Sequence, residues 1–141
     1  MAVVGFIDDV RPLPILPRLI CQACAVGVAW FAIGGWSEWH YGGSVYALSP
    51  AFQLIVAIAC LWFLNLYNFM DGSDGMAGGM AVFGFSAYGL AAWLTGNHIL
   101  SQASFVVAAA ASGFLCFNFH PARIFLGDAG SVPLGFLAGA I

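Results

Sequence analysis

Five aspartates stand in three short polar segments of a 141-residue chain that has only six acidic side chains. The first segment holds the adjacent pair Asp8-Asp9, the second holds Asp71 and Asp74, and the third holds Asp128. Mg²⁺ prefers oxygen ligands and usually takes one or two carboxylates together with substrate phosphates. The residue types and their grouping therefore make a metal or phosphate site the first hypothesis.

The Asp8-Asp9 pair is followed along the chain by Arg11 and Arg18. Two adjacent carboxylates repel each other, so a proton or a nearby cation is needed to reduce the repulsion between them. One interpretation is the solvated end of a helix, where charge is cheap even beside a membrane. The other is a metal or phosphate site in which arginine is the partner of the anion. The pattern alone leaves both interpretations open.

The second segment, residues 65–75, contains two Asp-Gly pairs, at Asp71 and Asp74, with Asn65 and Asn68 ahead of them. Asp and Gly let the backbone turn sharply, and Asp74 is a suitable N-cap for a following helix. An ordinary loop between helices explains these residues. It gives no reason for two asparagines at the end of an apolar stretch, where polar side chains need partners.

The third segment, residues 118–131, places Gly127-Asp128 and Gly130-Ser131 just before an apolar stretch. This pattern predicts the start of a helix, whose free N–H groups suit anions. A carboxylate at that position suits Mg²⁺. His120 in the same segment is interpreted as a hydrogen-bonded structural residue, because a lone histidine more often has that role than a catalytic one.

The composition indicates an integral membrane protein. Hydrophobic residues make up 62% of the chain and charged residues 6%, against about 25% charged in soluble domains. A chain this short cannot hide a mean hydropathy of +0.97 in a water-soluble core. Three basic side chains are too few to create the positive electrostatic potential that binds a polyanion such as a nucleic acid. A soluble enzyme, a nucleic-acid binder and a disordered linker are excluded.

The apolar stretches predict an all-α, polytopic membrane helix bundle. A membrane helix needs about 20 mostly apolar residues, and such stretches occur at residues 19–35, 51–69, 76–94 and 103–119. Turn-forming residues separate them at 36–50, 71–75, 95–102 and 120–131. Residues 1–7 resemble the last turns of a further helix, and another span begins near Val132. We expect about four full transmembrane helices with partial ones at each end.

The order of the spans places all three polar segments on the same face of the membrane. All three arginines also lie there, so the positive-inside rule makes this face cytoplasmic. Trp39 and His98 are expected on the opposite face. The polar chemistry is thus confined to one membrane surface.

The three segments, in this order and spacing, resemble the polyprenyl-phosphate N-acetylhexosamine-1-phosphate transferases of glycosyltransferase family 4. Phospho-N-acetylmuramoyl-pentapeptide transferase belongs to the same superfamily. The resemblance rests on Gly5-Phe6-Ile7-Asp8-Asp9, on residues 68–75 and on residues 118–131. The stretch Tyr67–Gly72 and the run from Arg11 to Gln22 look like the bacterial O-antigen and enterobacterial-antigen branch. The muramoyl-pentapeptide branch usually has lysines after its aspartate pair, and this chain has none.

The resemblance implies a reaction in which a lipid phosphate attacks the β-phosphate of a UDP-sugar, giving a lipid diphosphosugar and UMP. It implies UDP-N-acetylhexosamine and undecaprenyl (polyprenyl) phosphate as partners, Mg²⁺ as cofactor with Mn²⁺ as a substitute, the bacterial cytoplasmic (inner) membrane as location, and allows a homodimer. Carried over by motif, Asp8 and Asp9 are catalytic, Asp128 is the metal ligand, and the substrate-binding residues are Asn68, Asp71, Gly72, Asp74, Asn118 and Phe125, the last stacking on uracil.

Family members are longer, with further helices on both sides and a histidine-rich loop near their end. We therefore expect residues 1–141 to be the central part of a single integral-membrane transferase domain, incomplete at both ends. Two alternatives stay open. One is a transporter that uses intramembrane carboxylates, although here the acids stand at the ends of spans. The other is an inactive remnant of the transferase.

Overall fold

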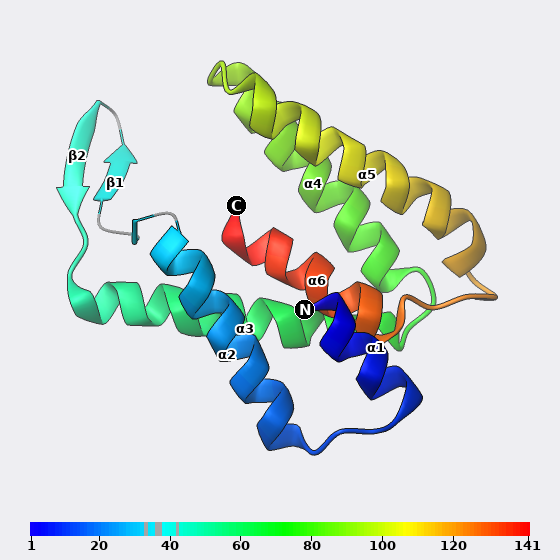
Figure 1. The fold of residues 1–141 in the computed structure, drawn as a ribbon. Coiled ribbons are helices and arrows are strands. Elements are labelled where there is room, and N and C mark those ends of the chain that lie inside the picture. The colour runs from blue at the N-terminus through cyan, green and yellow to red at the C-terminus, as the bar shows by residue number, and fades with distance from the viewer. Residues whose placement is uncertain (33, 36–37, 42) are drawn as a thin grey trace.

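The computed structural model describes residues 1–32, 34–35, 38–41 and 43–141 (Figure 1). Over these residues the chain forms six helices and one two-stranded β-hairpin. The prediction of an all-α membrane helix bundle is confirmed, and the hairpin is an addition that the sequence did not predict. The elements are α1 (Ala2–Val10), α2 (Ile15–Ala32), β1 (Glu38–Tyr41), β2 (Ser44–Ala47), α3 (Pro50–Asp71), α4 (Met76–Leu94), α5 (His98–Asn118) and α6 (Gly127–Ala140).

Helices α2, α3, α4 and α5 are long and apolar enough to cross a membrane. Each covers most of one predicted span; residue 33, within the first of these spans, lies outside the described residues. The helix α5 begins at His98 rather than at 103, because the side chain of Asn97 accepts a hydrogen bond from the N–H of Leu100 at 3.1 Å. Such a cap supports a helix start in a stretch of mixed polarity.

The hairpin lies in the predicted break at 36–50, of which residues 36, 37 and 42 are outside the described part of the chain. Its strands pair antiparallel, with Glu38 opposite Ala47 and Tyr41 opposite Ser44. In Figure 1 it stands at the end of α2 that is remote from the α3–α4 turn. Among the described residues, the hairpin thus stands at the opposite end of α2 from Arg18 and the polar segments (Figure 1).

The short helix α6 packs against α1, α3 and α4 and lies in the centre of the view in Figure 1. Two glycines allow the close approach of its neighbours. A Cβ on Gly5 of α1 would overlap the carbonyl oxygen of Asp128. A Cβ on Gly135 of α6 would lie 2.6 Å from the carbonyl oxygen of Phe63 in α3. Helix α6 is thus held in backbone contact with two elements that carry polar segments.

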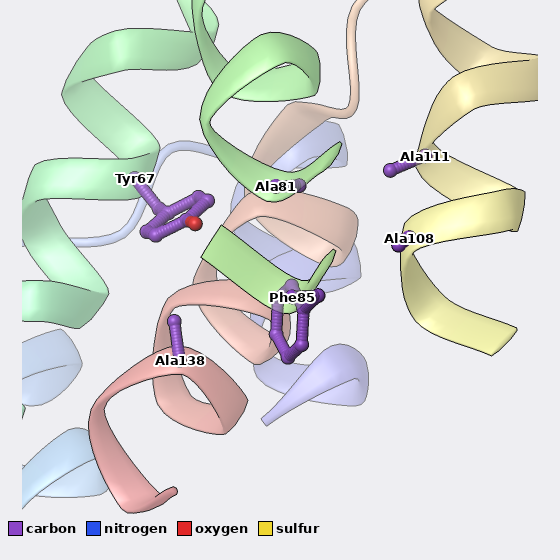
Figure 2. Close-up of a cluster of buried hydrophobic side chains, with 6 residues drawn as sticks. All are labelled: Tyr67, Ala81, Phe85, Ala108, Ala111 and Ala138. Carbon is purple, nitrogen blue, oxygen red and sulfur yellow. The ribbon is translucent and has the colours of Figure 1, made fainter. Parts of the chain in front are cut away.

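A cluster of small and aromatic side chains joins α3, α4, α5 and α6 (Figure 2). Alanines at the contacts bring the helix backbones together, as is usual between membrane helices. The ring of Tyr88 meets Phe85 edge-on, with centroids 6.0 Å apart, and its hydroxyl donates to the carbonyl oxygen of Ala138 at 3.0 Å. The buried members are Tyr67, Ala81, Phe85, Ala108, Ala111 and Ala138.

Many large apolar side chains lie on the outer surface and not in the core. Phe31 is 91% exposed, Phe69 79% and Phe83 78%. Exposed aromatic surface on this scale would be costly in water but is expected where helices face lipid tails. The structure and the composition therefore agree on an integral membrane protein.

Candidate active site

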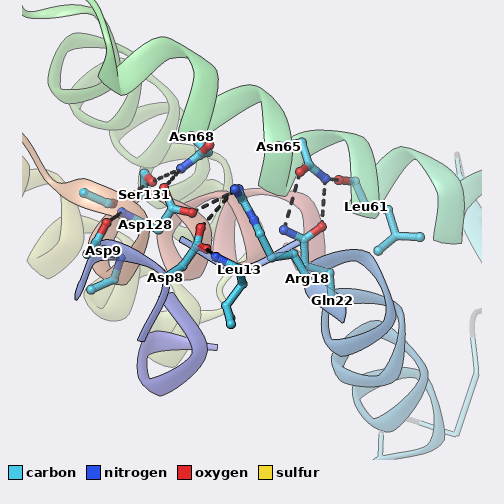
Figure 3. Close-up of polar contacts among 12 residues, drawn as sticks. Asp8, Asp9, Leu13, Arg18, Gln22, Leu61, Asn65, Asn68, Asp128 and Ser131 are labelled. Atoms are coloured by element: carbon cyan, nitrogen blue, oxygen red, sulfur yellow. Dashed lines mark hydrogen bonds and ion pairs between the residues drawn. The ribbon is translucent and has the colours of Figure 1, made fainter. Parts of the chain in front are cut away.

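A chain of charged side chains joins the first and third polar segments. The guanidinium of Arg18, at the start of α2, contacts Oδ2 of Asp8 in α1 through Nη1 at 2.9 Å and Oδ2 of Asp128 in α6 through Nη2 at 2.9 Å (Figure 3). The side chains of Asp8 and Asp128 are 8% and 18% exposed. Two carboxylates that are far apart in sequence thus share one cation in a partly buried place.

The second segment reaches the same carboxylate. Asn68, near the end of α3, donates through Nδ2 to Oδ1 of Asp128 and to the hydroxyl of Ser131, the latter at 3.2 Å (Figure 3). The Ser131 hydroxyl donates in turn to the carbonyl oxygen of Gly127 at 2.7 Å. Asp128 is therefore held from one side by an arginine of α2 and from the other by an asparagine of α3.

The acidities of the two carboxyl groups diverge. A hydrogen bond shared with Asp128, a second from the N–H of Leu13 at 2.6 Å, and the charge of Arg18 hold the pKa of Asp8 below its ordinary value. Burial raises the pKa of Asp128, and the neighbouring Asp8 raises it further, against the effects of Asn68 and Arg18. The surroundings of the two carboxyl groups therefore shift their pKa values in opposite directions.

Asp9 points to the backbone of α6 rather than to the side chain of Asp128. Its Oδ1 accepts from the N–H of Asp128 at 2.8 Å, and its Oδ2 accepts from the N–H of Ala129 at 3.0 Å. A carboxylate at this place is favoured by the unpaired N–H groups and the positive dipole end of a helix start. The two adjacent acids thus have different contacts, one with a side chain and one with a helix.

Asp71 accepts hydrogen bonds from the N–H groups of the two residues that precede Asp128 in the chain. Its Oδ1 accepts from Leu126 at 3.0 Å and its Oδ2 from Gly127 at 2.8 Å. The predicted helix start is present, and anions do occupy its N–H groups, because the carboxylates of Asp71 and Asp9 accept from four in succession. Glycine is required at 127, where φ is +64° and a Cβ would lie 2.8 Å from Oδ2 of Asp9.

A hollow of about 340 Å³ opens beside this helix start. The ring of Phe125 stands at it, 52% exposed, so an aromatic face is accessible next to the carboxylate of Asp128. A much smaller cavity of about 10 Å³, near the space of one water molecule, is also lined by Asp128, together with Asp8 and Arg18. The hollow brings together five predicted residues, Asn68, Asp71, Gly72, Phe125 and Asp128, with Gly127.

Asn118, also predicted to bind substrate, is fully buried at the end of α5. Its Oδ1 accepts from the N–H of Gly75 at 3.1 Å, and its Nδ2 donates to the carbonyl oxygen of Ile124 at 2.8 Å. It does not line the hollow. Both ends of its amide join the second polar segment to the third, which is a positioning contact, and its role in substrate binding stays a prediction.

Asp74 likewise lies away from the hollow and contacts the third segment. Its Oδ2 accepts from the N–H of Ala122 at 3.1 Å and lies 2.8 Å from Nδ1 of His120. These two partners, the N–H group first, lower the pKa of Asp74. The contact fixes the loop that leads to Phe125, and the predicted contact of Asp74 with substrate is untested.

The side chains present fit a Mg²⁺ ion that takes two carboxylates and completes its shell with water or phosphate oxygens. Among the described residues, no three His, Cys, Asp or Glu side chains stand close enough to hold a metal by themselves. Asp8 and Asp128 offer carboxylate oxygens around a position that now holds the cation of Arg18. Because Mg²⁺ takes one or two carboxylates and fills its shell with water and phosphate oxygens, this donor set suits it.

Four residues with contacts here, Arg18, Ser131, Gln22 and Asn65, were not among the predicted catalytic, substrate-binding or metal residues, although the sequence had offered Arg18 as a partner for an anion. Arg18 is central to the network, and Ser131 receives Asn68. Gln22, four residues after Arg18, forms a reciprocal hydrogen-bond pair with Asn65 at 3.4 and 2.9 Å, which joins α2 to α3 (Figure 3). The signal for it was a glutamine inside an apolar span, since such a side chain needs a partner from another helix.

The whole chain, residues 1–141, matches the family described as glycosyl transferase family 4. It is 35% identical over 140 residues to a probable undecaprenyl-phosphate N-acetylglucosaminyl 1-phosphate transferase of Bacillus subtilis, covering 95% of this chain and 38% of the relative. It is 32% identical to a phospho-N-acetylmuramoyl-pentapeptide-transferase of Moorella thermoacetica, covering 98% of this chain and 48% of the relative. The chain spans less than half the length of these relatives.

Proposed function

The chain belongs to glycosyl transferase family 4, and on this premise we propose that the full-length protein transfers N-acetylhexosamine 1-phosphate from a UDP-sugar to undecaprenyl phosphate. The products are a lipid diphosphosugar and UMP, and the reaction would begin a cell-surface polysaccharide of the O-antigen or enterobacterial-antigen kind. We place it in the bacterial cytoplasmic membrane, with the polar segments facing the cytoplasm and Mg²⁺ as cofactor.

The observation that carries this proposal is the single network that joins Asp8, Asn68 and Asp128. These residues come from three separate segments, yet Arg18 and Asn68 connect them beside an open hollow with an aromatic ring at its edge. A nucleotide sugar presents the matching chemistry, which is a flat base, a charged diphosphate and a polar sugar. The position at the end of the spans suits the meeting of a cytosolic donor with a membrane lipid.

In the reaction, an oxygen of the lipid phosphate forms a bond to the β-phosphorus of the donor, and the bond from that phosphorus to the oxygen of UMP breaks. A bound Mg²⁺ would neutralise the diphosphate charge, with Asp128 and Asp8 as the residues that hold it. Phe125 would stack on the uracil. Asn68 would orient Asp128, as it does in the structure.

Asp8 is better suited to hold a cation than to accept a proton. A general base works best with a pKa near the working pH, and the pKa of Asp8 is lowered by Asp128, Leu13 and Arg18. A phosphate monoester has a second pKa near 6, so the lipid phosphate is already mostly dianionic at neutral pH. Positioning and charge neutralisation should therefore carry most of the catalysis, as in other phosphoryl transfers.

The test is a reaction in detergent with the full-length protein, undecaprenyl phosphate and Mg²⁺. UDP-N-acetylglucosamine, UDP-N-acetylgalactosamine and UDP-N-acetylmuramoyl-pentapeptide are supplied in turn, because relatives of both named kinds match the chain. We expect UMP release with a UDP-N-acetylhexosamine and its loss with EDTA. Release with the pentapeptide donor alone would place the protein in the muramoyl branch.

Two other results would replace the transferase. Proteoliposomes that move a solute while no donor yields UMP would indicate a transporter. That outcome has little support in the sequence, since the four long helices carry no acidic residue except Asp71, the last residue of α3. Nucleotide-sugar binding without turnover would indicate an inactive remnant.

A further inference from the structure

Arg18 lies between the two carboxylates in a bridging geometry. Its Nη1 and Nη2 each contact one Oδ2 atom, that of Asp8 and that of Asp128, both at 2.9 Å (Figure 3). A planar guanidinium can serve two acceptors at once, which an ammonium group does with less precision of geometry. The Arg18 side chain is 27% exposed, so solvent screens this interaction only in part.

The other oxygens of the same pair are already held by N–H donors. Oδ1 of Asp8 accepts from the N–H of Leu13 at 2.6 Å, and Oδ1 of Asp128 accepts from the amide of Asn68. In the described part of the chain, the two Oδ2 atoms are therefore the oxygens of the pair without an amide partner, and both contact Arg18. The guanidinium stands where a bridging cation would find its ligands.

The position of Arg18 is set by contacts of its helix, α2, in addition to the ion pairs of its guanidinium. Gln22 one turn later is buried and bonded to Asn65 of α3, which fixes α2 beside the site. The long side chain of Arg18 extends from this fixed point and lines the small cavity between α1 and α6. Its two ion pairs use only part of the five N–H donors of a guanidinium.

We propose that Arg18 is an internal counter-cation that holds the place of the divalent metal ion between Asp8 and Asp128, and that it turns to the phosphate of the lipid when the metal enters. The inference rests on the proposed function, because it links the binding of metal to the binding of phosphate at that site. Arg18 and the metal compete for the same two oxygens. A phosphate that attracts Arg18 removes the competitor, so phosphate and metal strengthen each other's binding.

The proposal predicts that loss of Arg18 changes metal affinity in the opposite direction from loss of an arginine that only supports the site. If Arg18 only braced the two carboxylates, its loss would weaken metal binding by loosening the ligands. If Arg18 competes with the metal, its loss strengthens the binding of metal alone. It also reduces the linkage between metal and phosphate, since the residue that responds to both has gone.

The experiment measures Mn²⁺ binding to the full-length protein in detergent by the electron paramagnetic resonance of free Mn²⁺, without nucleotide sugar. We expect Arg18→Gln to bind Mn²⁺ about tenfold tighter than wild type, within the usual range of coupling between sites. Undecaprenyl phosphate should tighten Mn²⁺ binding in wild type and do so less in the variant. Arg11→Gln, which removes the exposed arginine at the end of α1, is the matched control and should leave Mn²⁺ binding unchanged.

Arg18→Lys keeps the positive charge and serves if the glutamine variant does not fold. A single ammonium cannot reproduce the two-pronged contact, so this variant should bind Mn²⁺ tighter than wild type by a smaller factor. Equal or weaker Mn²⁺ binding in the folded Arg18 variants, or no Mn²⁺ binding by any form, would overturn the proposal. UMP release is measured in parallel: a wild type that releases none would count against the transferase, while the Mn²⁺ titrations still decide the role of Arg18.

Discussion

The carboxylate of Asp9 accepts a hydrogen bond from the backbone N–H of Asp128, 119 residues later in the chain, at 2.8 Å. The preceding residue, Asp8, instead reaches Asp128 through Arg18. Asp9 therefore holds the backbone of Asp128, whereas Asp8 is linked to the side chain of Asp128 through Arg18. This division of contacts separates the expected effects of changing the two acids.

Replacing Asp128 with asparagine should lower UMP release by roughly 100-fold or more, as for the loss of a group that stabilises transition-state charge. The variant loses the anionic partner of Arg18 and one carboxylate for Mg²⁺, so residual activity should require more Mg²⁺. Glu38→Gln, the same chemical change in the hairpin, is the control. Unchanged turnover with unchanged Mg²⁺ dependence would remove Asp128 from the metal site.

Asp8→Asn and Asp9→Asn should both slow UMP release far more than they weaken nucleotide binding. They should differ in stability. An asparagine at 9 can accept only one of the two N–H groups at the start of α6 and sets its own NH₂ against the other, so the melting temperature should fall. Asp8→Asn keeps an oxygen for Leu13 and should melt near wild type. A scan that found the two variants equally stable would contradict the helix-positioning role of Asp9.

Gly5→Ala should destabilise the protein by roughly 1–3 kcal/mol, the usual cost of forcing an extra methyl group into a packed interior. The added Cβ would meet backbone atoms of Asp128 and Ala129, which cannot rotate away. Gly27→Ala is the matched control, because a Cβ there meets nothing within 4 Å in α2. Thermal unfolding in detergent measures both, and equal melting temperatures would refute the close contact of α1 with α6.

Mn²⁺ affinity should fall as the pH is lowered, because a protonated carboxyl group cannot ligate the metal. Burial and the neighbouring Asp8 raise the pKa of Asp128, so the fall should begin above the ordinary aspartate value of 3.8. In Asp8→Asn the neighbouring carboxylate is gone, and the midpoint should move to lower pH. Mn²⁺ titrations at a series of pH values test this, and a midpoint that moved upward would reverse the assigned effect of Asp8.

The orientation in the membrane can be tested with single cysteines in a background without the four native ones. Ser73 lies in the α3–α4 turn and His98 at the start of α5, both exposed. An impermeant maleimide applied to intact cells should label Cys substituted at 98 and leave 73 unlabelled until the cells are opened. The reverse pattern would place the polar segments outside.

The sequence was sufficient for the features that depend on local composition. Apolar stretches of membrane length predicted α2 to α5, because a span is specified by its own residues and needs no partner to be recognised. The number of crossings between the three polar segments then predicted that they gather at one end. Helix starts that depend on a single cap, such as Asn97 before α5, were less evident and were misplaced by a few residues.

Tertiary structure decided which polar groups meet. Asp71 and Asp9 were visible as acids, but their capping of α6 depends on contacts between residues 55 to 120 positions apart. The bridging place of Arg18 depends on how closely α1 and α3 approach α6, which Gly5 and Gly135 permit. Spacing along the chain determines which face of a helix a side chain occupies. The packing of separate helices determines whether charged groups on different helices come within hydrogen-bonding distance.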